Sequence, residues 1–413
     1  MYNFLEITLI MKVYPMLNEE IRQRSLALKD HLIEFRRDIH RHPEPSQKEV
    51  RTQRQIIGEL ADIGITEYKV YYKTGLAAII RGAFPGPTIG MRADMDALYI
   101  QEETGLDFSS ENPGVMHACG HDCHITMLLG AARILCAMKE RLHGNIKLIF
   151  QPAEEDGLNG GGSQWMIREG VLTDEPKVDF VIGQHIDVDH GAGDISCRPG
   201  PFFTTSDLFE INILGKGGHS AYPHLTNDPI LCAAHCITAL QSIISRNVDP
   251  HDAVILSVCT VAGGTRHNII PDTCKMSGGA RSYTEENSAL CRTRIRLIVE
   301  NTCAAFGCRA EITFTKSYGP VCNDENMYEK CREWVSEVIG SEHFLLVPPN
   351  NGGEDFSNFT KDIPGVFFLV GAKPADRPAC GPHTCGFTVN EDALLYGVMN
   401  LVAVAANYLE AER

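Results

Sequence analysis

The sequence predicts an α/β protein in which a domain with a mixed, mostly parallel sheet flanked by helices is interrupted by an inserted two-layer α+β domain. Three observations predict this fold class. The chain has 413 residues, which is too long for one comfortable core and suits two. Short apolar runs alternate with helical patterns up to about residue 193. The pattern then changes to alternating strands and long helices, and helices and a buried strand of the first type return near residue 327.

The larger domain is predicted to begin with one amphipathic helix over 18–41. Ile21, Leu32 and Ile39 belong to an apolar series at helical spacing, and Pro43 closes the segment. Strands are predicted at 76–80, 88–91, 146–150 and 178–182, and a buried helix at 125–138. Near the C-terminus we expect a helix at 327–339, a strand at 366–370 and a last helix at 391–409.

The inserted domain has its own series of elements. Strands are predicted at 207–214, 254–261, 274–278 and 309–315, and helical stretches at 228–245 and 288–306. We therefore predict a larger domain over 18–196 and 316–413, and an inserted domain over 197–315.

Composition excludes several classes of function. A net charge of −16 argues against a nucleic-acid partner, because phosphate binding needs a basic face. No stretch has the apolar length that we expect of a membrane helix, so the prediction is a soluble protein with no membrane partner. The 15 cysteines are odd in number and often lie in apolar or helical surroundings, as at Cys136, Cys232 and Cys236. This usage favours a reducing cytoplasm over disulfides.

The N-terminus does not resemble a signal peptide. It carries Glu6 early, has no basic start and has no small-residue cleavage site. Met1, Met11 and Met16 are alternative start residues.

Cys119 and His121 are separated only by Gly120, so that both side chains can point toward one cation from a bent loop. Such a pair alone is more often structural than metal-binding, and a cysteine is usually a small buried hydrophobe. Its interpretation therefore depends on other residues.

Those residues follow predicted strands. Glu154 and Glu155 come just after 146–150, His185 follows the next predicted strand, and Asp94 follows an earlier one. Open α/β sheets bind ligands at the carboxyl ends of their strands, and two adjacent carboxylates there need a cation or a proton. Taken alone, Glu154 and Glu155 could belong to a solvated acidic turn, and His185 could be a histidine of the core. Taken together, these residues predict a metal site.

Together with a histidine from the C-terminal segment, the sequence offers a mixed sulfur, nitrogen and oxygen set suited to Zn, Mn, Co or Ni. Five ligands exceed one tetrahedral site, which favours two divalent metal ions about 3.5–4 Å apart that share a bridging ligand and a water. Glu154, beside a ligand, is the candidate general base for that water. The five candidate ligands are Cys119, His121, Glu155, His185 and His383.

Several motifs together resemble the amidohydrolase branch of the M20 metallopeptidases, over nearly the whole chain. That branch includes aminoacylase-like, hippurate-hydrolase-like and auxin-conjugate-hydrolase-like enzymes. The motifs are Met91–Leu98, Met116–Asp122, Phe150–Glu155, Gly215–Ser220 with Pro223 and His224, Gly263 and Gly264 before Asn268–Asp272, and Gly352–Phe356.

The resemblance implies a two-metal catalytic domain whose insertion is a lid that also mediates dimerisation. It implies that Cys119 bridges the metals and that Glu154 is the general base. It further implies that His219 helps to hold the oxyanion, often from the partner's lid, and that Asn268 and Arg281 bind the substrate's carboxylate or oxyanion. A donor to the oxyanion is typically worth ~3–4 kcal/mol, and the fork of an arginine suits a carboxylate.

The chain departs from the family pattern near several ligands. The departures concern Asp156, Leu158 and Asn159 in a stretch usually richer in glycine, Cys123 after the cysteine loop, Gln184 before His185, and Thr384 and Cys385 after His383. His190 and His343 are the alternative ligands if His185 or His383 is misplaced. Asp94, Asp96 and His124 are expected to orient the imidazole ligands. Glu354 and Asp355 are expected either to join them or to cap the following segment.

The leading hypothesis for function is hydrolysis of an N-acyl amino acid, or a similar small amide with a free carboxylate, by a homodimer or higher homo-oligomer. The enzyme alternatives are a dipeptidase, a carboxypeptidase or an N-acetyl-diaminopimelate-type deacetylase using the same chemistry. A catalytically silent binding protein is the alternative from another class. Loss of Glu154 or of a ligand would have favoured it, and all are present.

Overall fold

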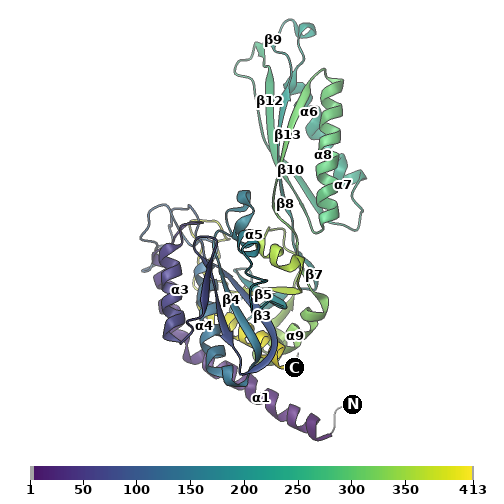
Figure 1. Cartoon of the computed structure of the whole chain (residues 1–413). Coiled ribbons are helices and arrows are strands. Elements are labelled where there is room, and N and C mark those ends of the chain that lie inside the picture. The colour runs from purple at the N-terminus through teal and green to yellow at the C-terminus, as the bar shows by residue number, and fades with distance from the viewer. Residues whose placement is uncertain (1–3, 412–413) are drawn as a thin grey trace.

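The computed structural model describes residues 4–411 and consists of two units joined end to end (Figure 1). The larger unit holds an eight-stranded sheet in the order β1-β2-β4-β3-β5-β16-β6-β15. The smaller unit holds a four-stranded antiparallel sheet in the order β10-β12-β8-β13. This arrangement confirms the predicted fold class. Of the alternative start residues, Met1 lies outside the described residues, and Met11 and Met16 lie within helix α1 (Phe4–Ala27).

The centre of the large sheet is parallel. Strands β4 (His143–Gln151), β3 (Phe84–Asp94), β5 (Phe180–Asp187) and β16 (Gly365–Gly371) lie next to one another and run in the same direction. Asp94 pairs in register with Gln151 at the carboxyl ends of β3 and β4. The residues that follow these strands therefore meet at one edge of the sheet, as predicted.

The sheet is flanked by helices that place the cysteine loop. Helix α4 (His121–Met138) is buried along most of its length and begins at His121, so this residue lies in its first turn. Gly120 precedes it with φ +86°, and a Cβ there would lie 3.2 Å from the side chain of Ile186. A larger residue is disfavoured both by this conformation and by this contact.

Helix α10 (Ala393–Ala411) corrects the expectation about apolar length. By length and composition its residues 393–410 are apolar enough to cross a membrane. However, 89% of this window is buried inside the protein, because α10 packs against α4 and the sheet. Its hydropathy is that of a core helix surrounded by protein.

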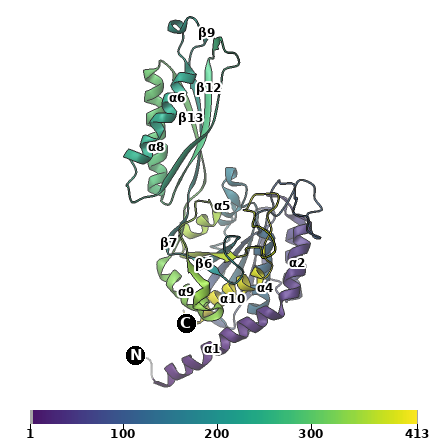
Figure 2. The same ribbon diagram turned by 180° about the vertical axis from the view of Figure 1, so that it is seen from behind.

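The first predicted helix is wrong in its extent. The segment forms two helices, because the chain breaks at Leu28 between α1 and α2 (Lys29–Arg41), and α1 begins well before Asn18. The break changes the direction of the chain, so that α1 packs on α10 whereas α2 packs on α4 (Figure 2). No glycine or proline marks this position in the sequence.

The remaining predicted elements of the larger unit are present with ends that differ by no more than five residues, whereas helix α3 and several short strands were not predicted. The elements not yet described are α3 (Val50–Asp62), β1 (Tyr68–Tyr71), β2 (Gly75–Arg81), α5 (Gly161–Arg168), β6 (Ile195–Cys197), β7 (Gly200–Phe203), β14 (Val321–Asn323), α9 (Glu325–Ile339) and β15 (Phe344–Leu346).

The smaller unit, called the lid below, is a two-layer structure. Helices on one face cover its sheet, and their apolar sides form a second core that is separate from the core of the large sheet. At the end far from the larger unit, two short strands pair in a small ribbon (Figure 1). The boundaries 197–315 remain a prediction. The elements are β8 (Ser206–Leu214), β9 (Gly218–His219), α6 (Pro229–Leu240), α7 (Ser242–Arg246), β10 (Val254–Gly263), β11 (Ile269–Ile270), β12 (Thr273–Ser282), α8 (Glu285–Ala305) and β13 (Arg309–Tyr318).

Candidate metal centre and catalytic site

A cavity of about 450 Å³ lies at the carboxyl ends of the parallel strands, beside the base of the lid. Its walls contain four of the five predicted ligands together with Glu154, and the fifth, His121, lies within 4.8 Å of Glu154 and Glu155. The lining residues that matter below are Cys119, Glu154, Glu155, His185, Arg281, Tyr318, Glu354 and His383. The structure therefore brings all five candidate ligands to one place.

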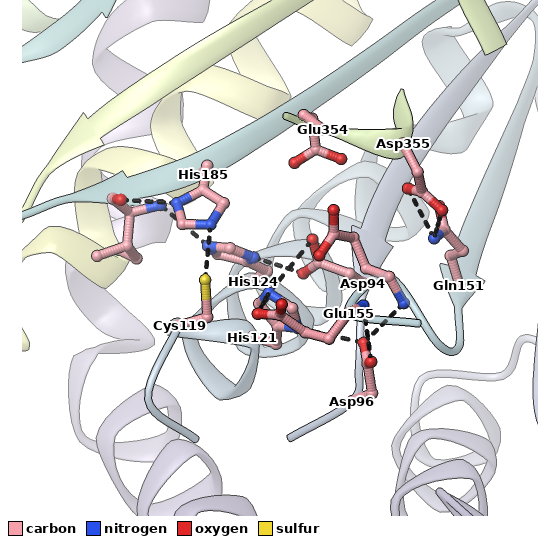
Figure 3. A network of polar contacts seen from close by, with 12 residues as sticks. Asp94, Asp96, Cys119, His121, His124, Gln151, Glu155, His185, Glu354 and Asp355 are labelled. Carbon is pink, nitrogen blue, oxygen red and sulfur yellow. Dashed lines mark hydrogen bonds and ion pairs between the residues drawn. The ribbon is translucent and has the colours of Figure 1, made fainter. Parts of the chain in front are cut away.

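The first pair is Cys119 with His185 (Figure 3). The Nε2 atom of His185 lies 3.3 Å from the Sγ atom of Cys119. The Nδ1 atom of His185 donates a hydrogen bond of 2.7 Å to the backbone carbonyl of Ile186, which can only accept. This contact fixes the proton on Nδ1 and leaves the lone pair of Nε2 directed at the cysteine, as a metal-binding imidazole requires.

Glu155 links the two other histidines. Its Oε1 atom lies 3.0 Å from Nε2 of His383 and 3.9 Å from Nε2 of His121. The His383 loop is held against the cysteine loop, because the backbone N–H of His383 donates to the carbonyl of Ala118 at 2.8 Å. His383 has φ +63°, a conformation that non-glycine residues rarely adopt and that is common at functional sites.

These residues fit two divalent metal ions. Cys119 belongs to two groups of donors, one with His121 and His185 and one with Glu155 and His383, and the atoms of each group lie within 4.8 Å of one another. Both ring nitrogens of His121 and the Oε1 atom of Glu155 are buried and have only charged neighbours at 3.0–3.9 Å, with no well-directed hydrogen bond among the described residues. Buried polar atoms usually make well-directed hydrogen bonds, so these atoms fit the role of cation ligands.

Two of the candidate ligands bind protons strongly. Burial, with Glu155 and Glu154 nearby, raises the pKa of the Cys119 thiol well above its ordinary value. Burial opposes a charge on His121, but Asp94 and Asp96 outweigh it and raise the pKa of the imidazole to about 10. Both groups therefore hold protons until a cation displaces them.

Asp96 holds the turn that carries the two glutamates. Its carboxylate accepts the backbone N–H groups of Glu154 at 3.0 Å and Glu155 at 3.1 Å, and also the hydroxyl of Ser46 at 2.6 Å. The same carboxylate lies 3.3 Å from Nδ1 of His121. Asp96 thus contacts one candidate ligand and orients another, as expected from the sequence.

His124 has both of its nitrogens occupied. Its Nε2 atom accepts the backbone N–H of Ile186 at 2.9 Å, so its Nδ1 atom carries the proton and donates to Asp94 at 2.5 Å. Burial lowers the pKa of His124 to about 4, against the effect of Asp94. A neutral histidine with two occupied nitrogens orients its neighbours and is not itself a ligand.

Arg92 is the buried counter-charge for three carboxylates. Its guanidinium lies 2.7 Å from Asp94, 3.1 Å from Glu354 and 2.8 Å from Asp355. Glu354 also caps the following turn by accepting the N–H of Phe356, which is one of the two roles expected from the sequence. Loss of one partner from such a buried group is strongly destabilising, because the others stay charged without compensation.

Glu154 faces the cavity and binds protons strongly. Burial, reinforced by Glu354 and Glu155, raises the pKa of its carboxyl group well above the ordinary value. The hydroxyl of Tyr318 donates to its backbone carbonyl. Tyr318 was not predicted, since it arrives on the last strand of the lid, 164 residues away in the sequence, and no local motif marks it.

The three residues predicted to bind substrate lie in two different parts of the structure. Arg281, on β12, lines the cavity, and its buried Nη1 atom has no hydrogen-bond partner among the described residues. His219 and Asn268 lie exposed at the far end of the lid, where the N–H of Ser220 donates to the Asn268 carbonyl at 3.1 Å (Figure 1). They do not reach the cavity of their own chain.

His219 is nevertheless prepared to donate a hydrogen bond. Its Nδ1 atom accepts the backbone N–H of Ala221 at 3.1 Å, so a neutral imidazole carries its proton on Nε2. The alternative ligands are engaged elsewhere, because His190 pairs with Asp187 at 2.6 Å and His343 with Asp194 at 2.9 Å.

Comparison with known proteins agrees with this geometry. A family model described as peptidase family M20/M25/M40 matches residues 90–407. The chain is 38% identical over 398 residues to thermostable carboxypeptidase 1 of Saccharolobus solfataricus, covering 94% of this chain and 98% of that protein. It is 36% identical over 385 residues to IAA-amino acid hydrolase ILR1-like 4 of Arabidopsis thaliana, covering 92% of this chain and 86% of that protein.

Among solved structures, the fold matches that of a dinuclear metal-binding peptidase from the M20 family of Bacillus subtilis. The TM-score is 0.81 at 33% sequence identity, and the match covers 93% of this chain and 99% of that chain. Fold, site and relatives together define a metal-dependent hydrolase of amide bonds. The chain belongs to peptidase family M20/M25/M40.

Proposed function

We propose that this enzyme hydrolyses the amide bond of N-acyl amino acids. The observation that carries the proposal is Arg281, whose unpartnered guanidinium nitrogen lies in the same cavity as Glu154 and the candidate ligands. A guanidinium in this position suits the free carboxylate of an amino-acid product. The relative named for IAA-amino acid hydrolysis supports a substrate of this class.

The residues divide the chemistry among them. Two divalent metal ions would be held by five residues, of which Cys119 belongs to both groups of donors: Cys119, His121, Glu155, His185 and His383. Bound there, such ions (Zn, Mn, Co or Ni) would activate water and polarise the scissile carbonyl. Glu154 takes a proton from the attacking water on a carboxylate oxygen and passes it to the leaving nitrogen. Arg281 holds the carboxylate and so orients the amide over the water.

A homodimer would complete this site. We propose that in a closed two-fold dimer the tip of each lid lies over the cavity of the other chain. The partner subunit's His219 would then donate its Nε2–H to the oxyanion, and the partner subunit's Asn268 would bind beside it. Support comes from the exposed position of both residues and from the fixed tautomer of His219.

Complementation tests this arrangement. Glu154→Gln and His219→Ala proteins should each be nearly inactive, whereas their co-expressed mixture should regain about a quarter of wild-type activity, because half of the dimers carry one intact site. A mixture of Glu154→Gln with Cys119→Ala is the control and should stay inactive. An inactive first mixture would mean that His219 does not act across the dimer.

A substrate panel tests the function itself. Acetyl, benzoyl and indole-acetyl amino acids should be hydrolysed when Mn, Co, Ni or Zn is added. The matching carboxamides should show a kcat/KM lower by about 10–100-fold, since a charge-assisted hydrogen bond is worth ~1.5–3 kcal/mol. Arg281→Met should remove this preference, and Arg281→Lys should keep part of it. Equal rates on acids and carboxamides with the wild-type enzyme would contradict the proposal.

A carboxypeptidase is the second candidate, because one relative bears that name and the same arginine would bind the carboxylate of a peptide. Peptides of increasing length distinguish the two, since a higher kcat/KM on longer peptides than on acyl amino acids favours the carboxypeptidase. We further propose that the enzyme works in the cytoplasm without a nucleic-acid or membrane partner, in keeping with its acidity and its 15 cysteines, all free thiols.

A further inference from the structure

The core of the lid contains three buried cysteines that point at one another. Cys232 and Cys236 lie one turn apart on α6, and Cys303 lies in the last turn of α8. The two helices run side by side over one face of the lid sheet (Figures 1 and 2). All three side chains are completely buried. We call Cys232, Cys236 and Cys303 the lid thiol cluster.

The geometry of the cluster suits a metal ion. The thiol of Cys232 lies 3.6 Å from the Sγ atom of Cys303, and the three sulfur atoms all lie within 4.8 Å of one another. A tetrahedral zinc ion with zinc–sulfur bonds of about 2.3 Å separates its sulfur ligands by about 3.8 Å. A disulfide would instead need sulfur atoms at about 2.05 Å.

Hydrogen bonds connect the three thiols of the cluster. Cys232 donates to Cys303, and Cys303 also interacts with the thiol of Cys236. Elsewhere, the buried Cys197 donates to a backbone carbonyl at 3.2 Å. Cys308, just before β13, contacts the thiol of Cys232 at the edge of the cluster, and its own thiol also donates to the backbone carbonyls of Asn227 at 3.8 Å and Phe306 at 3.7 Å. The lid thus presents the spacings Cys-x3-Cys and Cys-x4-Cys on two neighbouring segments.

We propose that the lid thiol cluster binds one thiophilic metal ion, Zn²⁺ or Cu⁺, as a structural site separate from the catalytic centre. Thiolate ligands select these ions. Each thiol that binds the metal releases its proton to solvent. Because the sulfur atoms are buried, the ion is expected to enter as the lid folds.

X-ray absorption at the metal edge tests the site with the lid intact. We would use the full-length Cys119→Ala protein, purified from cells, because it lacks the thiolate of the catalytic cavity. The expected result is a shell of about three sulfur neighbours at roughly 2.3 Å around zinc. Elemental analysis then identifies Zn or Cu. A zinc or copper spectrum with only nitrogen and oxygen neighbours would overturn the proposal, whatever the catalytic activity.

Variants locate the site. Cys232→Ser/Cys303→Ser should lose one metal equivalent per chain relative to the wild-type enzyme. Cys291→Ser is the matched control, since Cys291 is equally buried on α8 but lies twelve residues before Cys303, which places it about 18 Å away along the helix. Equal metal content in all three proteins would mean that the cysteines are only small apolar core residues. A Cys232–Cys303 disulfide found by mass spectrometry would also overturn the proposal. If the double variant does not fold, the X-ray absorption spectrum of the Cys119→Ala protein decides whether the cluster binds a metal ion.

Discussion

Glu154→Gln should lower kcat by at least about 100-fold and leave the metal content unchanged, because a positioned general base typically contributes 10²–10⁴ in rate. Glutamine keeps the shape of the side chain but cannot accept a proton. The carboxylate it replaces is buried beside Glu155 and Glu354 and lines the cavity that the candidate metal ligands share. The measurements are steady-state kinetics on an N-acyl amino acid and elemental analysis of the purified protein.

Glu169→Gln provides the control for this experiment. Glu169 lies exposed after α5 and outside the catalytic cavity, so its replacement should change neither kcat nor metal content. If Glu154→Gln kept the wild-type kcat, Glu154 would not be the general base. Loss of metal in the same variant would instead indicate that Glu154 is a ligand.

Cys119→Ala should release metal from the catalytic cavity and lower kcat/KM by more than about 100-fold. Replacing a residue that hydrogen-bonds to a metal ligand typically lowers metal affinity or activity by about 10–100-fold. Replacing a ligand shared by two ions should lower both further, because both ions depend on it. Cys119 is the member common to both groups of donors. Elemental analysis and activity at increasing Mn or Zn concentration measure the effect.

Cys123→Ala is the matched variant. Cys123 is as deeply buried, four residues along on α4, but its thiol lies outside the cavity. It should keep its metal and most of its activity. Cys119→Ala protein with the same metal content and kcat/KM as Cys123→Ala would contradict a bridging role for Cys119.

Much of the fold was predictable because its central elements are long and strongly periodic. The parallel strands β3, β4 and β5 and the helices α4, α8 and α10 lie close to where the sequence placed them. The break at Leu28 was not predictable, because it depends on α1 and α2 packing against different helices. Helix α3 and the short strands at the edges of the sheet were missed because they are short or weakly apolar.

The placement of the donors was also predictable in part. Strand ends deliver Asp94, Glu154 and His185 to one edge because neighbouring parallel strands must share it. No sequence pattern predicted that the loop of His383 contacts the loop of Ala118. The two loops are far apart in the sequence, and the backbone hydrogen bond between them forms only in the folded chain.

The sequence by itself determined the family and the fold class and predicted a set of donor residues, because these are expressed in contiguous motifs and in the period of apolar residues. Only the tertiary structure decided that Arg281 and Tyr318 enter the cavity while His219 and Asn268 stay at the far end of the lid. Only packing joins Cys232 to Cys303 across 71 residues. Contacts between segments this far apart depend on how whole elements pack, which no local pattern records.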